Sequence, residues 1–179
     1  MILGMARGVY YAAEMLLVGS CAFETLLRAK LPVVTSLRWQ PLRWTVLVLA
    51  LVAALAWLGL AARQMADRLD GQILAQTATD TLFGQVFLLR LVALLGLALL
   101  MILRRGRKLA VTLAALALAL PAATSPAAQA SPASFIAVGA TLDGLHLLAC
   151  GFWIGGLAVL AMLFRRKDPN ILFRPVAIL

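Results

Sequence analysis

Five apolar runs dominate this sequence and leave little choice of fold. A helical span of a bilayer needs about 20 mostly apolar residues, and runs suited to this occupy residues 8–27, 44–62, 82–103, 108–123 and 135–164. The runs are rich in Leu and Ala and do not alternate with a period of two, so they predict helices rather than the strands of a membrane barrel. The sequence therefore predicts an all-α fold, a polytopic transmembrane helical bundle that forms a single domain over residues 1–179.

The composition agrees with a membrane protein and argues against a soluble one. Apolar residues make up 64% of the chain and charged residues 13%, whereas soluble domains usually carry about 25% charged residues. The net charge of +9 comes from Lys and Arg clustered mainly between the apolar runs, a pattern that indicates membrane topology rather than nucleic-acid binding. We therefore expect the lipid bilayer, and no nucleic acid, as a partner.

Several motifs of soluble enzymes are missing from the sequence. It contains no phosphate-binding glycine loop, no nucleophile elbow, no Cys-x-x-Cys pair and no His-Glu-x-x-His motif. Nothing therefore supports ATP hydrolysis, acyl transfer or zinc proteolysis, and we expect no enzymatic activity.

Lys and Arg are divided unequally between the two sides of the predicted bundle. The side that holds the N-terminus receives three of them, Arg7, Arg63 and Arg68. The other side receives twelve, which are Arg28, Lys30, Arg38, Arg43, Arg104, Arg105, Arg107, Lys108, Arg165, Arg166, Lys167 and Arg174. Because cytoplasmic loops carry the excess of Lys and Arg, the sequence predicts an N-terminus outside the cytoplasm and a C-terminus inside it.

The segment 64–81 connects the second and third apolar runs on the predicted outer side. Its apolar residues Met65, Leu69, Ile73 and Leu74 recur at helical spacing, which predicts a short amphipathic helix lying on the outer surface. A solvated loop is the alternative.

Four ionisable residues lie at a similar depth inside three of the runs. Counting about 1.5 Å per residue from the outer ends puts Glu14 near 9 Å, Arg90 and Asp143 near 12 Å, and His146 near 16 Å. One interpretation is an intramembrane polar site for an ion, a proton or a buried cofactor, because such residues are usually functional. The other is an Arg–carboxylate pair that only fixes helix packing.

The fifth run carries a second candidate feature. Asp143, His146, Cys150 and Trp153 follow at spacings that place them on one face of a helix. An imidazole and a thiolate one turn apart can both bind a soft ion such as Cu(I), although a cysteine is also an ordinary apolar packing residue. The metal-ligand candidates are therefore His146, Asp143, Glu14 and Cys150.

Two local patterns concern packing rather than chemistry. Gly151, Gly155 and Gly156 contain a Gly-x-x-x-Gly step, which allows a neighbouring helix to approach closely. Glu24 and Arg28 are four residues apart near the predicted inner end of the first run, so we expect a salt bridge between them.

The fifth and third runs resemble a known family. The segment Leu142-Asp143-Gly144-Leu145-His146-Leu147-Leu148-Ala149, followed by Gly151-Phe152-Trp153-Ile154-Gly155-Gly156-Leu157, is similar to the signature of the copper resistance D family. The segment Asp80-Thr81-Leu82-Phe83-Gly84-Gln85, which leads to Arg90, resembles that family's Thr-x-Phe-Gly and Arg segment. Ala6-Arg7, Gly19 and Phe23 match more loosely in the first run.

This resemblance implies a bacterial inner-membrane protein of copper uptake or homeostasis that acts beside a periplasmic copper-binding protein. It implies about eight helices, of which this chain would supply the N-terminal part, and a distant similarity to helical bundles that bind haem b. Family members usually carry Gly-His-Ala near the end of the fourth helix, where this chain has Thr124-Ser125-Pro126. His146 is then the only histidine, which excludes a bis-histidine haem site within one chain.

Three functions follow as alternatives. The first is copper transport or homeostasis with a copper ion bound at the polar site. The second is a haem-associated or electron-transfer subunit in which His146 supplies one axial ligand. The third is a structural subunit that packs against a partner or a second copy of the chain.

Overall fold

The computed structural model describes residues 2–27, 39–66, 71–124 and 136–165, which are almost entirely helical and contain no strand. The elements in chain order are α1 (Ile2–Leu27), α3 (Trp39–Ala66), α4 (Gly71–Asp80), α5 (Leu82–Leu103), α6 (Arg107–Ala119), the 3-10 helix η1 (Leu120–Thr124) and α8 (Ile136–Arg165). Within these ranges five helical stretches are long and apolar enough to cross a membrane. The predicted all-α bundle of five membrane helices is therefore confirmed.

The helix boundaries follow the apolar runs closely in one case and exceed them in others. α5 begins and ends where the sequence predicts, at residues 82 and 103. α1 begins at Ile2 rather than at residue 8, and α3 covers Trp39–Ala66 rather than 44–62. α3 can begin before the apolar run because Pro41 lies in its first turn, where a missing backbone N–H costs nothing.

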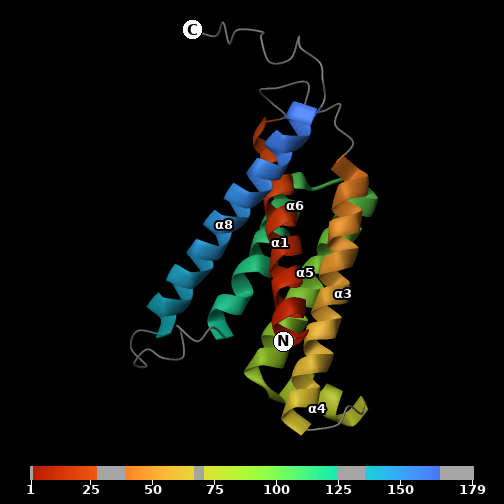
Figure 1. Ribbon diagram of the computed structural model, residues 1–179, viewed down its shortest axis with the longest axis vertical. Helices are drawn as coiled ribbons and strands as arrows, with labels where there is room; N and C mark the ends of the chain where they lie inside the picture. The colour runs from red at the N-terminus through yellow and green to blue at the C-terminus, as the bar shows by residue number, and fades with distance from the viewer. Residues whose placement is uncertain (1, 28–38, 67–70, 125–135, 166–179) are drawn as a thin grey trace, which may run out of the picture.

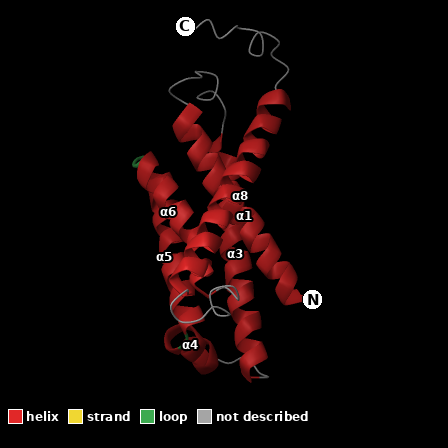
Figure 2. Cartoon of the chain, turned by 90° about the vertical axis from the view of Figure 1, so that its left-hand side faces the viewer, coloured by secondary structure: helices red, strands yellow, loops and turns green. Residues whose placement is uncertain are grey.

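α1 lies at the centre of the bundle, with α3, α6 and α8 packed around it (Figure 1). α5 packs on α6, α4 and α3, and α8 crosses α1 at an angle, as the turned view shows (Figure 2). Several helices contribute side chains that are less than 2% exposed, among them Leu17, Leu47, Leu97 and Leu118. Burying apolar side chains between helices in this way gives the bundle its close packing.

The contact between α1 and α8 is made by glycines. A Cβ atom placed on Gly19 would lie 2.3 Å from Gly155 Cα, so the two backbones touch at this point. Gly151 faces Leu118 and Met15, and Gly156 faces the ring of Phe23. The glycines of the Gly-x-x-x-Gly step thus lie on the face of α8 that packs against the bundle.

α4 forms a corner with the start of α5. Thr81 Oγ1 donates a hydrogen bond to Thr77 O at 2.6 Å and accepts one from Gly84 N at 2.9 Å, so it ends one helix and caps the next. A Cβ on Gly84 would lie 2.0 Å from Thr77 O, which leaves room only for glycine. The short helix predicted within 64–81 is confirmed as α4, which lies at one end of the bundle (Figure 1). Of the apolar residues that predicted it, Ile73 and Leu74 lie in α4, Met65 lies in α3 and Leu69 lies outside the described residues, and the place of α4 on the outer surface stays a prediction.

A tight turn joins α5 to α6. Arg104 and Gly106 both have left-handed backbone conformations, with φ values of 53° and 67°. At the other end of α6 the α-helix stops at Ala119 and continues as η1. Pro121 explains this change, because it has no backbone N–H to donate and so interrupts the α-helical hydrogen-bond pattern just after Leu120, whose own N–H still bonds to Leu116 O.

Candidate functional site

A buried ion pair joins α1 to α5 in the core of the bundle. Arg90 Nη2 lies 3.3 Å from Glu14 Oε2, and the two side chains are 3% and 1% exposed. The hydroxyl of Tyr10, one turn before Glu14, donates a hydrogen bond to the other carboxylate oxygen. Both oxygens of Glu14 are therefore occupied.

Aromatic rings from α1 and α3 surround the guanidinium of this pair. Arg90 Cζ lies 4.2 Å from the centroid of the Tyr10 ring, 5.3 Å from that of Trp57 and 5.8 Å from that of Tyr11. Arg90 Nε is buried without a hydrogen-bond partner. Contacts with ring faces and with a carboxylate together offset the cost of an arginine at this depth.

The same rings also contact a second arginine on the surface. Arg7 Cζ lies 5.7 Å from the centroid of Tyr11 and 5.6 Å from that of Trp57. Tyr11 and Trp57 are themselves 6.0 Å apart. The aromatic cluster therefore extends from the exposed Arg7 to the buried Arg90.

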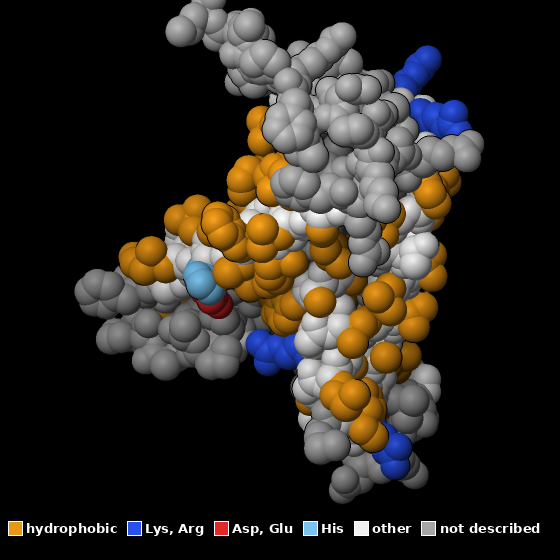
Figure 3. Space-filling model, turned by 45° about the horizontal axis from the view of Figure 1, so that its top comes forward, with side chains coloured by type: hydrophobic (Ala, Val, Ile, Leu, Met, Phe, Trp, Pro, Cys, Tyr) orange, Lys and Arg blue, Asp and Glu red, His pale blue; other side chains and the backbone are white. Residues whose placement is uncertain are grey.

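The polar residues of α8 form a separate group. His146 is exposed, while Asp143 and Cys150 are half-buried. His146 Nε2 lies 3.6 Å from Cys150 Sγ, one turn further along the helix. Figure 3 shows the histidine at the surface, among hydrophobic side chains. The contact brings an imidazole nitrogen and a thiol sulfur, both soft metal ligands, together on α8.

The four predicted metal ligands do not form one site. Glu14 pairs with Arg90 inside the bundle, whereas the exposed His146 contacts Cys150 on α8. No group of three or more His, Cys, Asp or Glu side chains in the described ranges could hold a metal ion. The expectation of one shared site is therefore corrected to two separate groups. Depth along a helix sets the level of a side chain but not the direction in which it points.

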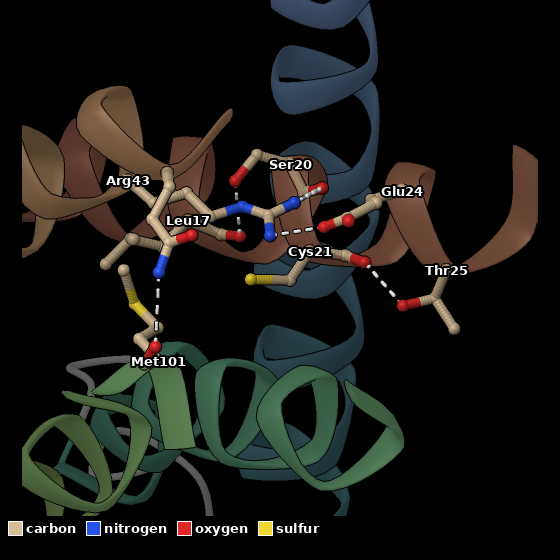
Figure 4. A network of polar contacts seen from close by, with 8 residues as sticks. Leu17, Ser20, Cys21, Glu24, Thr25, Arg43 and Met101 are labelled. Carbon is tan, nitrogen blue, oxygen red and sulfur yellow. Dashed lines mark hydrogen bonds and ion pairs between the residues drawn. The ribbon is translucent and has the colours of Figure 1, made fainter. Parts of the chain in front are cut away.

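A third polar group joins α1 to α3 (Figure 4). Arg43 forms an ion pair with Glu24, and its Nη2 donates to the backbone oxygen of Ser20 at 2.7 Å. The sequence predicted a pair between Glu24 and Arg28, but Arg28 lies outside the described residues. In the sequence, Arg43 was used only to predict the orientation of the helices. Its contact with Glu24 was therefore not predicted.

The signal for that contact was present in the spacing of the chain. Consecutive membrane helices run antiparallel, so residues equally far from their connection lie at one level. Glu24 and Arg43 flank the 28–38 segment at similar distances along the chain. Gln40 Nε2 also donates to Met101 O at 3.2 Å, which brings the start of α3 to the end of α5.

Comparison with known proteins identifies one family. The sequence model described as copper resistance protein D-like, N-terminal domain, matches residues 1–134 of the 179. The match includes the Glu14–Arg90 pair and the Thr81–Gly84 corner and ends before α8 begins. No curated protein and no solved structure matches the chain.

Proposed function

This chain belongs to the copper resistance protein D-like family, and on that premise we propose that it carries copper across the membrane. Family membership supports a role in copper resistance or homeostasis in general. The finer proposal, movement of the ion through the bilayer, draws on the membrane-spanning helices and on the chemistry of α8.

The observation that carries this proposal is the contact between His146 and Cys150. Their ring nitrogen and sulfur are 3.6 Å apart within a helix that is long enough to span the bilayer. Thiolates select soft ions such as Cu(I), and imidazole suits copper as well. A histidine within a membrane helix carries an energetic cost, and the ionisable residues found in such helices are usually functional. We therefore assign these two side chains to binding copper in transit.

The other two predicted ligands take different roles in this proposal. Asp143 lies three residues before His146 on the same face of α8, and we assign it to balancing the charge of the cation. Glu14 has both oxygens engaged by Tyr10 and Arg90. We therefore assign Glu14 to holding the bundle together rather than to binding copper.

The proposal also includes an orientation and a partner. The excess of Lys and Arg on one side supports an N-terminus in the periplasm and a C-terminus in the cytoplasm, in a bacterial inner membrane. A periplasmic copper-binding protein would then exchange the ion with the outer side of the bundle.

Substitution of the two α8 ligands tests the site. We expect His146→Ala and Cys150→Ala to abolish copper accumulation in cells that depend on this protein. Loss of a residue that only hydrogen-bonds to a metal ligand costs about 10- to 100-fold in metal affinity. Loss of the ligand itself should therefore lower the Cu(I) affinity of the purified variants by at least that much. Cys21→Ala is the matched control, because Cys21 is a free, buried thiol on α1. Equal accumulation in all three variants and wild type would refute the assignment.

An absorbance spectrum and a search for co-purifying chains separate the other functions. A Soret band in the purified protein that disappears in His146→Ala would favour the haem-associated subunit. A stable partner without copper or haem would favour the structural subunit.

A further inference from the structure

The turn between α5 and α6 concentrates positive charge at the end of two membrane helices. Arg104, Arg105, Arg107 and Lys108, which we call the basic turn, all have exposed side chains. The ion pairs among the described residues are those of Arg43 and Arg90, so none involves the basic turn.

The backbone holds these four cations close together. Arg104 occupies the left-handed C-cap of α5, with φ of 53°. Glycine is the usual residue at such a position, since a side chain there carries a conformational cost. The first turn of α6 contains no acidic residue. The turn thus keeps an arginine at a strained position, and none of the carboxylates in the described ranges forms an ion pair with it.

Apolar side chains lie next to the basic turn on both helices. Ile102 is 64% exposed, Leu103 55% and Leu109 52%. Because α5 and α6 are both suited to span the membrane, their connection lies at the bilayer surface. Cations at the surface with exposed apolar side chains directly below them match the two parts of a phospholipid, a charged headgroup and its acyl chains.

We propose that the basic turn binds anionic phospholipids through their headgroup phosphates. The charges are complementary, and a basic residue near an anionic membrane surface strengthens attraction by about fivefold. The exposed apolar residues beside the turn favour a lipid over a soluble anion, because only the lipid brings acyl chains to them. This site is independent of the proposed copper site on α8.

Lipid retention measured by native mass spectrometry tests the proposal. The purified full chain is exchanged into micelles that contain equal amounts of phosphatidylglycerol and phosphatidylcholine. We expect wild type to retain phosphatidylglycerol preferentially and to lose this preference as salt rises, since exposed charges are screened over about 8 Å at physiological ionic strength. Equal retention of the two lipids by wild type would overturn the proposal.

Two sets of variants assign the preference to the turn. Arg104→Gln, Arg105→Gln, Arg107→Gln and Lys108→Gln are combined in one variant, which should lose the preference. The charge-retaining combination Arg104→Lys, Arg105→Lys, Arg107→Lys and Lys108→Arg should keep it. An unchanged preference in the Gln variant would contradict the proposal.

A variant with two substitutions is used in case the four Gln substitutions prevent insertion of the protein into the membrane. Arg105→Gln with Arg107→Gln should reduce the preference, with about fivefold expected for each charge. Arg63→Gln, in the last turn of α3, is the control for loss of charge elsewhere and should leave the preference unchanged. An equal effect per removed charge in the two variants would show that net charge, and not the turn, selects the lipid.

Discussion

An arginine inside a membrane helix requires a partner, and this requirement shapes the centre of the bundle. Arg90 meets it with a carboxylate from α1 and with aromatic rings from α1 and α3. The sequence predicted that Arg90 needs a partner and placed Glu14 at a similar depth. It gave no indication of the rings, because ring contacts depend on the rotation of each helix about its axis.

Removing the charge of Glu14 should destabilise the fold strongly. Glu14→Gln leaves the Arg90 guanidinium buried without a counter-charge, and breaking a buried ion pair in this way costs about 3–5 kcal/mol. Thermal unfolding in detergent, followed by circular dichroism, measures the loss. Asp80→Asn, an exposed carboxylate at the end of α4, is the control. Equal unfolding temperatures for the two variants would exclude a structural role for the pair.

The hydroxyl of Tyr10 should contribute through its hydrogen bond alone. Tyr10→Phe keeps the ring over Arg90 and removes the donor to Glu14. Hydrogen bonds to charged groups contribute about 1.5–3 kcal/mol, so we expect a loss of that size in the free energy of unfolding. Tyr11→Phe changes a neighbouring ring of the same cluster and should cost less than about 0.5 kcal/mol. The prediction fails if Tyr11→Phe costs as much as Tyr10→Phe.

At the scale of the element, helical periodicity explains why the predicted site divided into two. His146 and Gly155 are nine residues apart, which is about two and a half turns of an α-helix. The two residues therefore lie on opposite faces of α8. Because Gly155 contacts α1, His146 has to point away from the bundle. The sequence contained this information, but only the packing of α8 on α1 shows which of its faces is the inner one.

The glycine contact between α1 and α8 should not tolerate a methyl group. A Cβ on Gly19 would lie 2.3 Å from Gly155 Cα, which is backbone and has no alternative rotamer. We expect Gly19→Ala to lower the free energy of unfolding by about 1–3 kcal/mol, the usual cost of overpacking. Gly59→Ala on α3 is the control, since nothing lies within 4 Å of its Cβ. It should be neutral or stabilising, because alanine favours the helix by about 1 kcal/mol.

At the scale of the whole molecule, the bilayer makes the fold predictable. The length and apolarity of the five runs determine where helices form, because backbone groups in lipid have to be paired within the helix. The same rule does not stop a helix where its apolar run ends, and α1 and α3 both begin before theirs. It does not determine which helices are neighbours. The central position of α1 depends on its contacts with α3, α6 and α8, which apolarity alone cannot rank.

The orientation of the whole bundle gives the last prediction. The charge bias predicts that the α5–α6 turn lies in the cytoplasm and α4 outside, because Lys and Arg are retained on the inner side during insertion. Both segments carry exposed residues, Arg105 and Gln72, at which a cysteine can be introduced after Cys21 and Cys150 are changed to serine. A membrane-impermeant maleimide added to intact spheroplasts should label Gln72→Cys, which is then on the periplasmic side. It should label Arg105→Cys only after permeabilisation. The reverse pattern would invert the predicted orientation and place the basic turn on the periplasmic side.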